Sequence, residues 1–244
     1  MNTNADDARP WCEERLHNPA EDLYYARLFS ARETRAAITA IAAIYIELET
    51  TTTAFRDLNT ARTKLAWWRE ELARLADGRP AHPATQLLAT SNAMSTLNLL
   101  PDLVTGAELN LLAGPANDLA SAGMQAERGF ARLVIALGTL TNAKGTDDYA
   151  ALGKALGLAR TLTTTLAPEA RSAIATTARN GLVAERTRIV ASPPMLHILA
   201  ALAWHRATRP ETTVPTRTTN RRRVFIAWRA ARGKLPRPLR TKRR

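Results

Sequence analysis

The stretch that most constrains the fold runs from Asn59 to Pro83 and reads NTARTKLAWWREELARLADGRPAHP. Asn59 is a suitable residue to cap the start of a helix, and Gly78 and Pro80 are typical of the region just past its end. Between them, apolar side chains recur every three or four residues and so share one helix face: Leu65, Trp68, Leu72 and Leu75. The stretch predicts an amphipathic helix over 59–77 that packs into a helical core.

The composition favours an all-α protein with one sizeable domain. The chain has 244 residues, enough to bury a substantial core, and aromatic residues make up only 5% of it. No Val/Ile-rich alternating run of the kind that forms strands is present. A single cysteine, Cys12, excludes an internal disulfide and suits a reducing compartment. The polar, acidic start differs from a secretory signal, and no apolar run is long enough to span a bilayer. We therefore expect a cytoplasmic protein, soluble or peripheral at the inner face of the membrane.

The net charge of +12 is concentrated at one end of the chain. Residues 1–216 hold 22 basic and 22 acidic side chains, which cancel, whereas residues 217–244 hold twelve Lys and Arg and no acid. The sequence thus predicts a neutral helical domain over 1–216, followed by a basic C-terminal helix and tail over 217–244.

Periodicity and turn residues predict a succession of helices along the chain. Ser30 and Glu33 have the spacing of a capping box at the start of the second helix, and Pro101 is expected to end the fourth. The residues after 233 are expected to be disordered. The predicted helices span 19–30, 31–55, 59–77, 83–100, 109–113, 117–140, 147–166, 169–190, 192–208 and 221–233.

Several blocks, in the same order, resemble the squalene/phytoene synthase family. The tandem Trp67–Trp68 with Gly78 and His82–Pro83 is similar to the family's LQWWRD…G…HP signature. Further similar blocks are DLYYARLFSARETRAAITAIAAIYIEL, the leucine-rich helix that ends in LG, GKALGLARTLTTT and IAWRAAR, which are residues 22–48, 127–138, 153–165 and 226–232. The resemblance implies a single-domain helical bundle of the isoprenoid-synthase type around a central cavity. It also implies enzymes that condense two prenyl diphosphates head to head.

The chain departs from the family at the residues that carry the chemistry. Family enzymes hold Mg²⁺ with two DxxxD pairs on facing helices, because i, i+4 spacing places both carboxylates on one face. At the first position this chain has Glu47, Glu49 and the run Thr50–Thr53, and at the second it has Thr161–Thr165. Threonine hydroxyls are neutral and cannot replace a carboxylate pair. In this respect the sequence is similar to the divergent branch that includes the mitochondrial complex I assembly factor.

No other residues supply a metal site in the sequence. The adjacent acidic pairs Asp6–Asp7, Glu70–Glu71 and Asp147–Asp148 are splayed apart by a helix, and we expect them on solvated faces or at helix starts. The four histidines lack metal-ligand spacing. We expect no cofactor, with Mg²⁺ required only if the chain is an active synthase.

The two threonine runs suggest a hypothesis for the family cavity. It survives as a neutral, hydroxyl-lined pocket for an isoprenoid or lipid tail, or the threonines fill a collapsed site. The candidate lining residues are Tyr45, Glu49, Thr53, Thr161, Thr164 and Thr165. If a phosphate binds, the candidates are Arg56, Arg160 and Arg186, because guanidinium groups bind phosphate well.

The basic tail has three interpretations. Arg221, Arg222, Arg223, Trp228, Arg229 and Arg232 interleave with Val224, Phe225 and Ile226 as in helices that bind anionic membranes. Arginine-rich segments also bind nucleic acid, which we regard as the weaker reading. The third interpretation is that the helix packs its apolar face on the bundle and keeps its charges in water.

The sequence favours a non-catalytic family member that binds an isoprenoid, a lipid or a partner protein, as an assembly factor does. The alternative is an active prenyltransferase that condenses prenyl diphosphates in squalene or phytoene biosynthesis. It would need Glu47 or Glu49 together with arginines to bind diphosphate.

Overall fold

The computed structural model describes residues 5–17, 21–54, 57–91, 93–141, 149–209 and 217–240. Every regular element in these ranges is helical, which confirms the predicted all-α fold. The α-helices are α1 (Ala5–His17), α2 (Glu21–Leu28), α3 (Arg32–Ala54), α4 (Leu58–Ala76), α5 (Pro83–Ala89), α6 (Leu100–Ala113), α7 (Leu119–Arg128), α8 (Phe130–Thr141), α9 (Ala150–Thr161), α10 (Pro168–Ala184), α11 (Arg186–Ala191), α12 (Pro194–Ala207) and α13 (Arg217–Ala231). The described residues also form two 3-10 helices, η1 (Met94–Leu99) and η3 (Arg237–Leu239).

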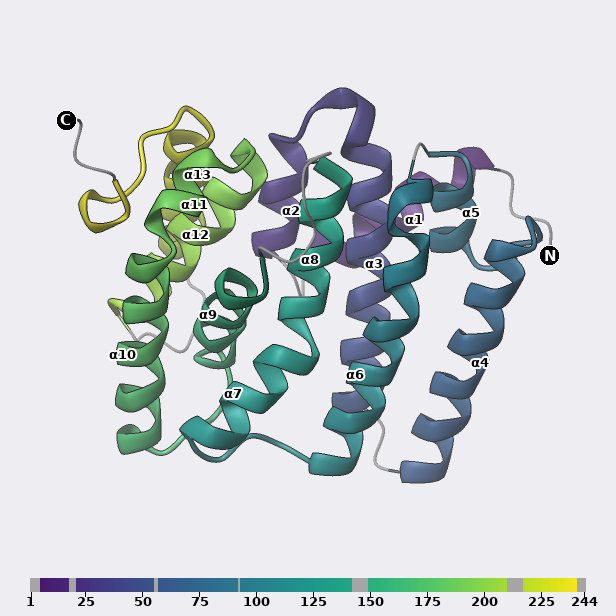
Figure 1. The fold of residues 1–244 in the computed structure, drawn as a ribbon, viewed down its shortest axis with the longest axis horizontal. Helices are drawn as coiled ribbons and strands as arrows, with labels where there is room; N and C mark the ends of the chain where they lie inside the picture. Colours follow the sequence, from purple (N-terminus) through teal and green to yellow (C-terminus); the bar gives the residue numbers. More distant parts are fainter. Residues whose placement is uncertain are drawn as a thin grey trace.

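The helices form a bundle around two central members. Helix α3 contacts α1, α5, α6 and α8, and α9 contacts α7, α8, α10 and α12. Helices α4 and α10 lie at opposite ends of the bundle, and α13 lies on α12 beside α2 (Figure 1). One hydrophobic core runs through all of these elements, because buried side chains from α1 to η3 belong to a single cluster.

Helix α3 is buried on nearly all sides, as its apolar sequence predicts. Ile38, Ile41, Ile44, Tyr45 and Leu48 are buried as expected, and so are the alanines between them. A helix that is apolar all round can only be stable when other helices surround it, which is where α3 lies.

Helix α4 shows the predicted apolar stripe with a different cap. The four predicted core residues are buried, and Gly78 follows the helix with φ of 73°. The cap is Asp57 instead of Asn59, because the Asp57 carboxylate accepts hydrogen bonds from the backbone N–H groups of Asn59 and Thr60.

The prediction that Glu71 faces solvent is wrong. Its side chain is fully buried and accepts hydrogen bonds from the backbone N–H groups of Ala81 and His82, each at 2.8 Å, and from the Thr85 hydroxyl. Arg74 donates to its second oxygen at 2.8 Å. Burial alone would raise the pKa of Glu71, but these hydrogen bonds outweigh it and hold the pKa below its usual value. Glu71 thus fixes the loop between α4 and α5.

Several predicted helix boundaries differ from the structure, among them the start at 31, the end at 100 and the span 117–140. Ser30 does not cap α3, because the helix begins only at Arg32, and the Ser30 hydroxyl donates to the Ala26 carbonyl of α2, 2.8 Å away. Pro101 begins α6 instead of ending a helix, because proline at the first turn lacks only an N–H that would have no helical partner. The predicted helix over 117–140 is divided at Gly129 into α7 and α8.

The prediction of disorder after residue 233 is wrong for residues 234–240. Leu235 and Leu239 are buried in the main core, and the Arg240 Nε donates to the Leu235 carbonyl at 2.7 Å. Gly233 has φ of 70°, a conformation that favours glycine, and it turns the chain back toward α12.

Candidate functional site

A cavity of about 700 Å³ lies between the C-terminal ends of α3 and α9. Helices α6, α7 and α8 and the turn after α6 supply the remaining walls. The cavity is lined by all six candidate residues, Tyr45, Glu49, Thr53, Thr161, Thr164 and Thr165. We call this cavity the central pocket. The two threonine runs therefore do not fill a collapsed site.

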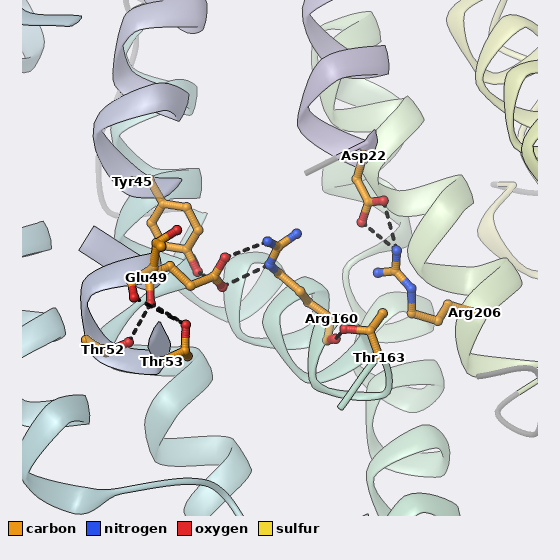
Figure 2. A network of polar contacts seen from close by, with 9 residues as sticks. Asp22, Tyr45, Glu49, Thr52, Thr53, Arg160, Thr163 and Arg206 are labelled. Atoms are coloured by element: carbon orange, nitrogen blue, oxygen red, sulfur yellow. Dashed lines mark hydrogen bonds and ion pairs between the residues drawn. The ribbon is translucent and has the colours of Figure 1, made fainter. Parts of the chain in front are cut away.

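Five of the seven threonines that line the central pocket donate their hydroxyl protons to backbone carbonyls. Thr52 and Thr53 donate to the carbonyl of Glu49, at 2.8 and 3.1 Å, and Thr163 donates to the carbonyl of Arg160 at 2.9 Å (Figure 2). These bonds satisfy carbonyl groups that helix ends otherwise leave without a partner. The threonines consequently add neutral side chains to the pocket wall, and most of their hydroxyl protons are already used.

One ion pair crosses the central pocket. Arg160 on α9 binds both carboxylate oxygens of Glu49 on α3, with Nε–Oε1 at 3.0 Å and Nη2–Oε2 at 2.6 Å (Figure 2). The Tyr45 hydroxyl donates to the same carboxylate at 3.0 Å. Burial alone would raise the pKa of Glu49, but Arg160 and Tyr45 outweigh it and hold the pKa below its usual value. Both residues are therefore charged at neutral pH, and the pair contributes no net charge.

Part of the remaining pocket wall is apolar and closely packed. The rings of Tyr45 and Phe130 meet edge to face, with centroids 5.7 Å apart, and Arg160 lies over Phe130. Gly157 lets α9 approach α7, because a Cβ there would lie 2.8 Å from the Cβ of Ala126.

Three amide side chains that line the pocket were missed in the sequence, those of Asn110, Asn117 and Gln125. Asn110 donates to the backbone carbonyl of Gln125 at 3.3 Å, and Gln125 donates to the carbonyl of Gly114. The Oδ1 of Asn110 is buried and has no hydrogen-bond partner in the described residues. Nothing in the sequence marks these residues, because α6 and α7 meet only in the folded chain.

Comparisons with known proteins agree with this architecture. Residues 16–167 match the family model of squalene/phytoene synthase, which covers more than half of the chain. The chain belongs to the squalene/phytoene synthase family. A dehydrosqualene synthase solved in complex with a ligand has a similar fold, with a TM-score of 0.72 at 11% sequence identity. The similarity covers 94% of this chain and 98% of that one. A search of curated proteins found no match.

The Mg²⁺ that the squalene/phytoene synthase family implies does not fit the residues of this pocket. Glu49 is the only carboxylate among the described lining residues, and both its oxygens are held by Arg160. Glu47 lies on another face of α3 and is held by Arg15 and by Lys64. No cluster of three or more metal-binding side chains occurs in the described part of the chain. A hard cation needs several oxygen ligands that are free to bind it.

Two of the three candidate phosphate ligands, Arg160 and Arg186, do not come together. Arg160 lies in the central pocket, and Arg186 begins α11 and is not among the lining residues. Arg56 lies outside the described residues. Near the pocket, Arg206 of α12 binds both oxygens of Asp22 on α2 at 2.8 Å (Figure 2).

The candidate tail residues lie on α13, except Arg232, which directly follows the helix, and three large apolar side chains of α13 face outward. Val224, Phe225 and Trp228 are 47%, 54% and 38% exposed, whereas Ala227 and Ala230 are buried. The interpretation that α13 packs its large apolar side chains on the bundle is therefore wrong for these three. The basic candidates Arg221, Arg222, Arg229 and Arg232 are exposed, and Arg223 is partly buried. Among the helices that the structure describes, none is both long and apolar enough to cross a bilayer.

Proposed function

We propose that this chain does not condense prenyl diphosphates and instead binds a neutral isoprenoid or lipid tail in the central pocket. The observation that carries the proposal is the Glu49–Arg160 pair, which occupies the one carboxylate that lines the pocket. Departure of diphosphate requires metal ions or free cations that neutralise the leaving group. Here the single guanidinium is neutralised by the protein itself.

The dimensions and lining of the central pocket support an apolar ligand. A cavity of about 700 Å³ is within the usual range for sites that hold small organic molecules. Leu48, Leu103 and Phe130 provide apolar walls, and the threonines add methyl groups. Such a lining favours a hydrocarbon chain over a multiply charged group.

Asn110 adds a preference for the head of the ligand. Its buried Oδ1 lacks a hydrogen-bond donor among the described residues, and an unpaired buried acceptor is costly. A ligand hydroxyl would supply that donor. We therefore propose a prenyl alcohol or a lipid with a neutral hydroxyl head. A role like that of the complex I assembly factor branch, in which the loaded protein contacts a partner, is compatible with this proposal.

Calorimetry tests the proposal directly. Farnesol and geranylgeraniol, delivered from cyclodextrin, are titrated into the full chain beside their diphosphates, with and without Mg²⁺, and the mixtures are assayed for condensed product. We expect the alcohols to bind, Mg²⁺ to change nothing and no product to form. Mg²⁺-dependent binding of a diphosphate with turnover would establish the prenyltransferase alternative.

A cavity-filling variant assigns the binding to the central pocket. Ala107 lines the cavity, so Ala107→Phe places a ring inside it and should abolish binding of the alcohol. Leu112→Phe is the matched control, because Leu112 is 61% exposed on the same helix and lies outside the pocket lining. Equal binding to both variants would place the ligand elsewhere.

A further inference from the structure

A second cavity, of about 470 Å³, lies between α12, α13 and the segment 234–240. We call it the α12–α13 pocket. Its walls are of two kinds. Trp204, Ile226 and Leu235 are apolar, and the basic members include Arg222, Arg229 and Arg237. No described residue that lines it is acidic.

Four cations that line this pocket have no carboxylate partner within the described residues. Arg222, Arg229, Lys234 and Arg237 form no ion pair there, and residues 217–244 contain no acid at all. By contrast, Arg206 on α12 forms an ion pair with Asp22. The accumulated positive potential also acts on His205, whose pKa is lowered to about 4 by burial and by nearby arginines, Arg222 first among them.

Buried leucines hold the segment after α13 in place. Leu235 and Leu239 pack into the core, and Arg240 donates to the Leu235 carbonyl. Lys234 and Arg237 therefore line the pocket on an ordered segment opposite α13. A fixed set of cations around a concave surface is suited to a phosphate group.

An exposed apolar surface adjoins the pocket. Val224, Phe225 and Trp228 project from α13, and the rings of Phe225 and Trp228 stack with centroids 6.0 Å apart. Arg229 lies 5.7 Å from the centroid of Phe225, and Arg232 lies 4.0 Å from that of Trp228. Phe225 also lines the pocket, so the cationic and the apolar surface are continuous.

We propose that this surface docks on an anionic phospholipid bilayer, with a lipid phosphate in the α12–α13 pocket and Val224, Phe225 and Trp228 among the acyl chains. A bilayer satisfies both parts of the surface, because it offers phosphate groups beside hydrocarbon. Nucleic acid would match the cations and stack on the rings, but it offers nothing to Val224. The proposal is independent of the ligand in the central pocket.

Sedimentation with vesicles tests the proposal on the full chain. Vesicles of phosphatidylcholine alone are compared with vesicles that also contain phosphatidylglycerol, and we expect binding to the anionic vesicles. Replacing Arg222, Arg229 and Arg237 with Gln should weaken partitioning about a hundredfold, since each arginine near an anionic surface contributes about fivefold. Phe225→Ser with Trp228→Ser should weaken it by about tenfold for each ring.

The matched control removes the same charge elsewhere. Arg9, Arg32 and Arg62 are exposed on α1, α3 and α4 and form no ion pair in the described residues, so their replacement by Gln should change partitioning less than about threefold. An equal loss in this control would overturn the proposal in favour of net charge alone. Circular dichroism and thermal melting of each variant establish that it is folded.

Fluorescence quenching provides a measurement that needs no charge variant. Vesicles with brominated acyl chains should quench part of the tryptophan emission, and Trp228→Phe should remove that part. Unchanged quenching in Trp228→Phe would overturn the insertion. Binding of inorganic phosphate or of duplex DNA, without recruitment to anionic vesicles, would replace the bilayer with a soluble phosphate ligand or with nucleic acid.

Discussion

The two pockets of this protein use arginine in opposite ways. In the central pocket Arg160 is bound through two hydrogen bonds to Glu49, and the wall is otherwise neutral. In the α12–α13 pocket, Arg222, Arg229 and Arg237 have no carboxylate partner among the described residues. The difference leads us to expect that the partner of an arginine, more than its presence in a cavity, decides which ligands the cavity accepts.

The largest expected effect is the loss of stability on removing a buried carboxylate that is hydrogen-bonded inside the helical bundle. Glu71→Ala leaves the N–H groups of Ala81 and His82 and the Thr85 hydroxyl without their acceptor. We expect a loss of about 4 kcal/mol in the free energy of unfolding, measured by urea denaturation. Glu70→Ala is the control, since Glu70 is 72% exposed and should cost less than about 0.5 kcal/mol. Equal effects of the two substitutions would contradict the role of Glu71.

The second prediction concerns a variant in which Arg160 of the central pocket loses its carboxylate partner, like the arginines of the α12–α13 pocket. Glu49→Gln removes the charge that neutralises Arg160, so stability should fall by about 2 kcal/mol and the pocket should gain affinity for a prenyl phosphate. The double variant Glu49→Gln with Arg160→Met should recover stability and lose the new affinity. Calorimetry with farnesyl phosphate and urea denaturation measure the two effects. A single variant that gains no affinity for phosphate would show that neutralisation is not what excludes anions.

The third and smallest effect is the response of the paired charges to acid. For Asp22, Glu49 and Glu71, burial alone would raise the pKa, but their partners outweigh it and hold each pKa below the ordinary values of 3.8 for Asp and 4.5 for Glu. The folded state therefore binds protons less readily than the unfolded state. Their contribution is complete above about pH 5 and is lost as the pH falls through the lower folded-state values. We expect a loss of roughly 1 kcal/mol between pH 5 and pH 4, measured by urea denaturation at each pH. Stability that rises over this interval would contradict the pairing.

Much of the fold was predictable because the local sequence of each helix decides which of its faces is apolar. A period of 3.6 residues places apolar side chains of α3 and α4 on the sides that become buried, and Ile41, Leu48 and Trp68 are buried as expected. The blocks that resemble the squalene/phytoene synthase family predicted the bundle, and the missing aspartate pairs could be read directly from the threonine runs.

The sequence by itself thus determined the helical class, the family and the absence of both metal-binding motifs. Only the tertiary structure decided which charges are paired. Glu49 and Arg160 lie 111 positions apart, and Glu71 meets Thr85 only because the chain turns back after Gly78. The tertiary structure also decided that Ala227 and Ala230 of α13 are buried, whereas Phe225 and Trp228 are exposed. The physical reason is that periodicity acts within one helix, whereas an ion pair or a buried face requires a neighbour that only the packed bundle supplies.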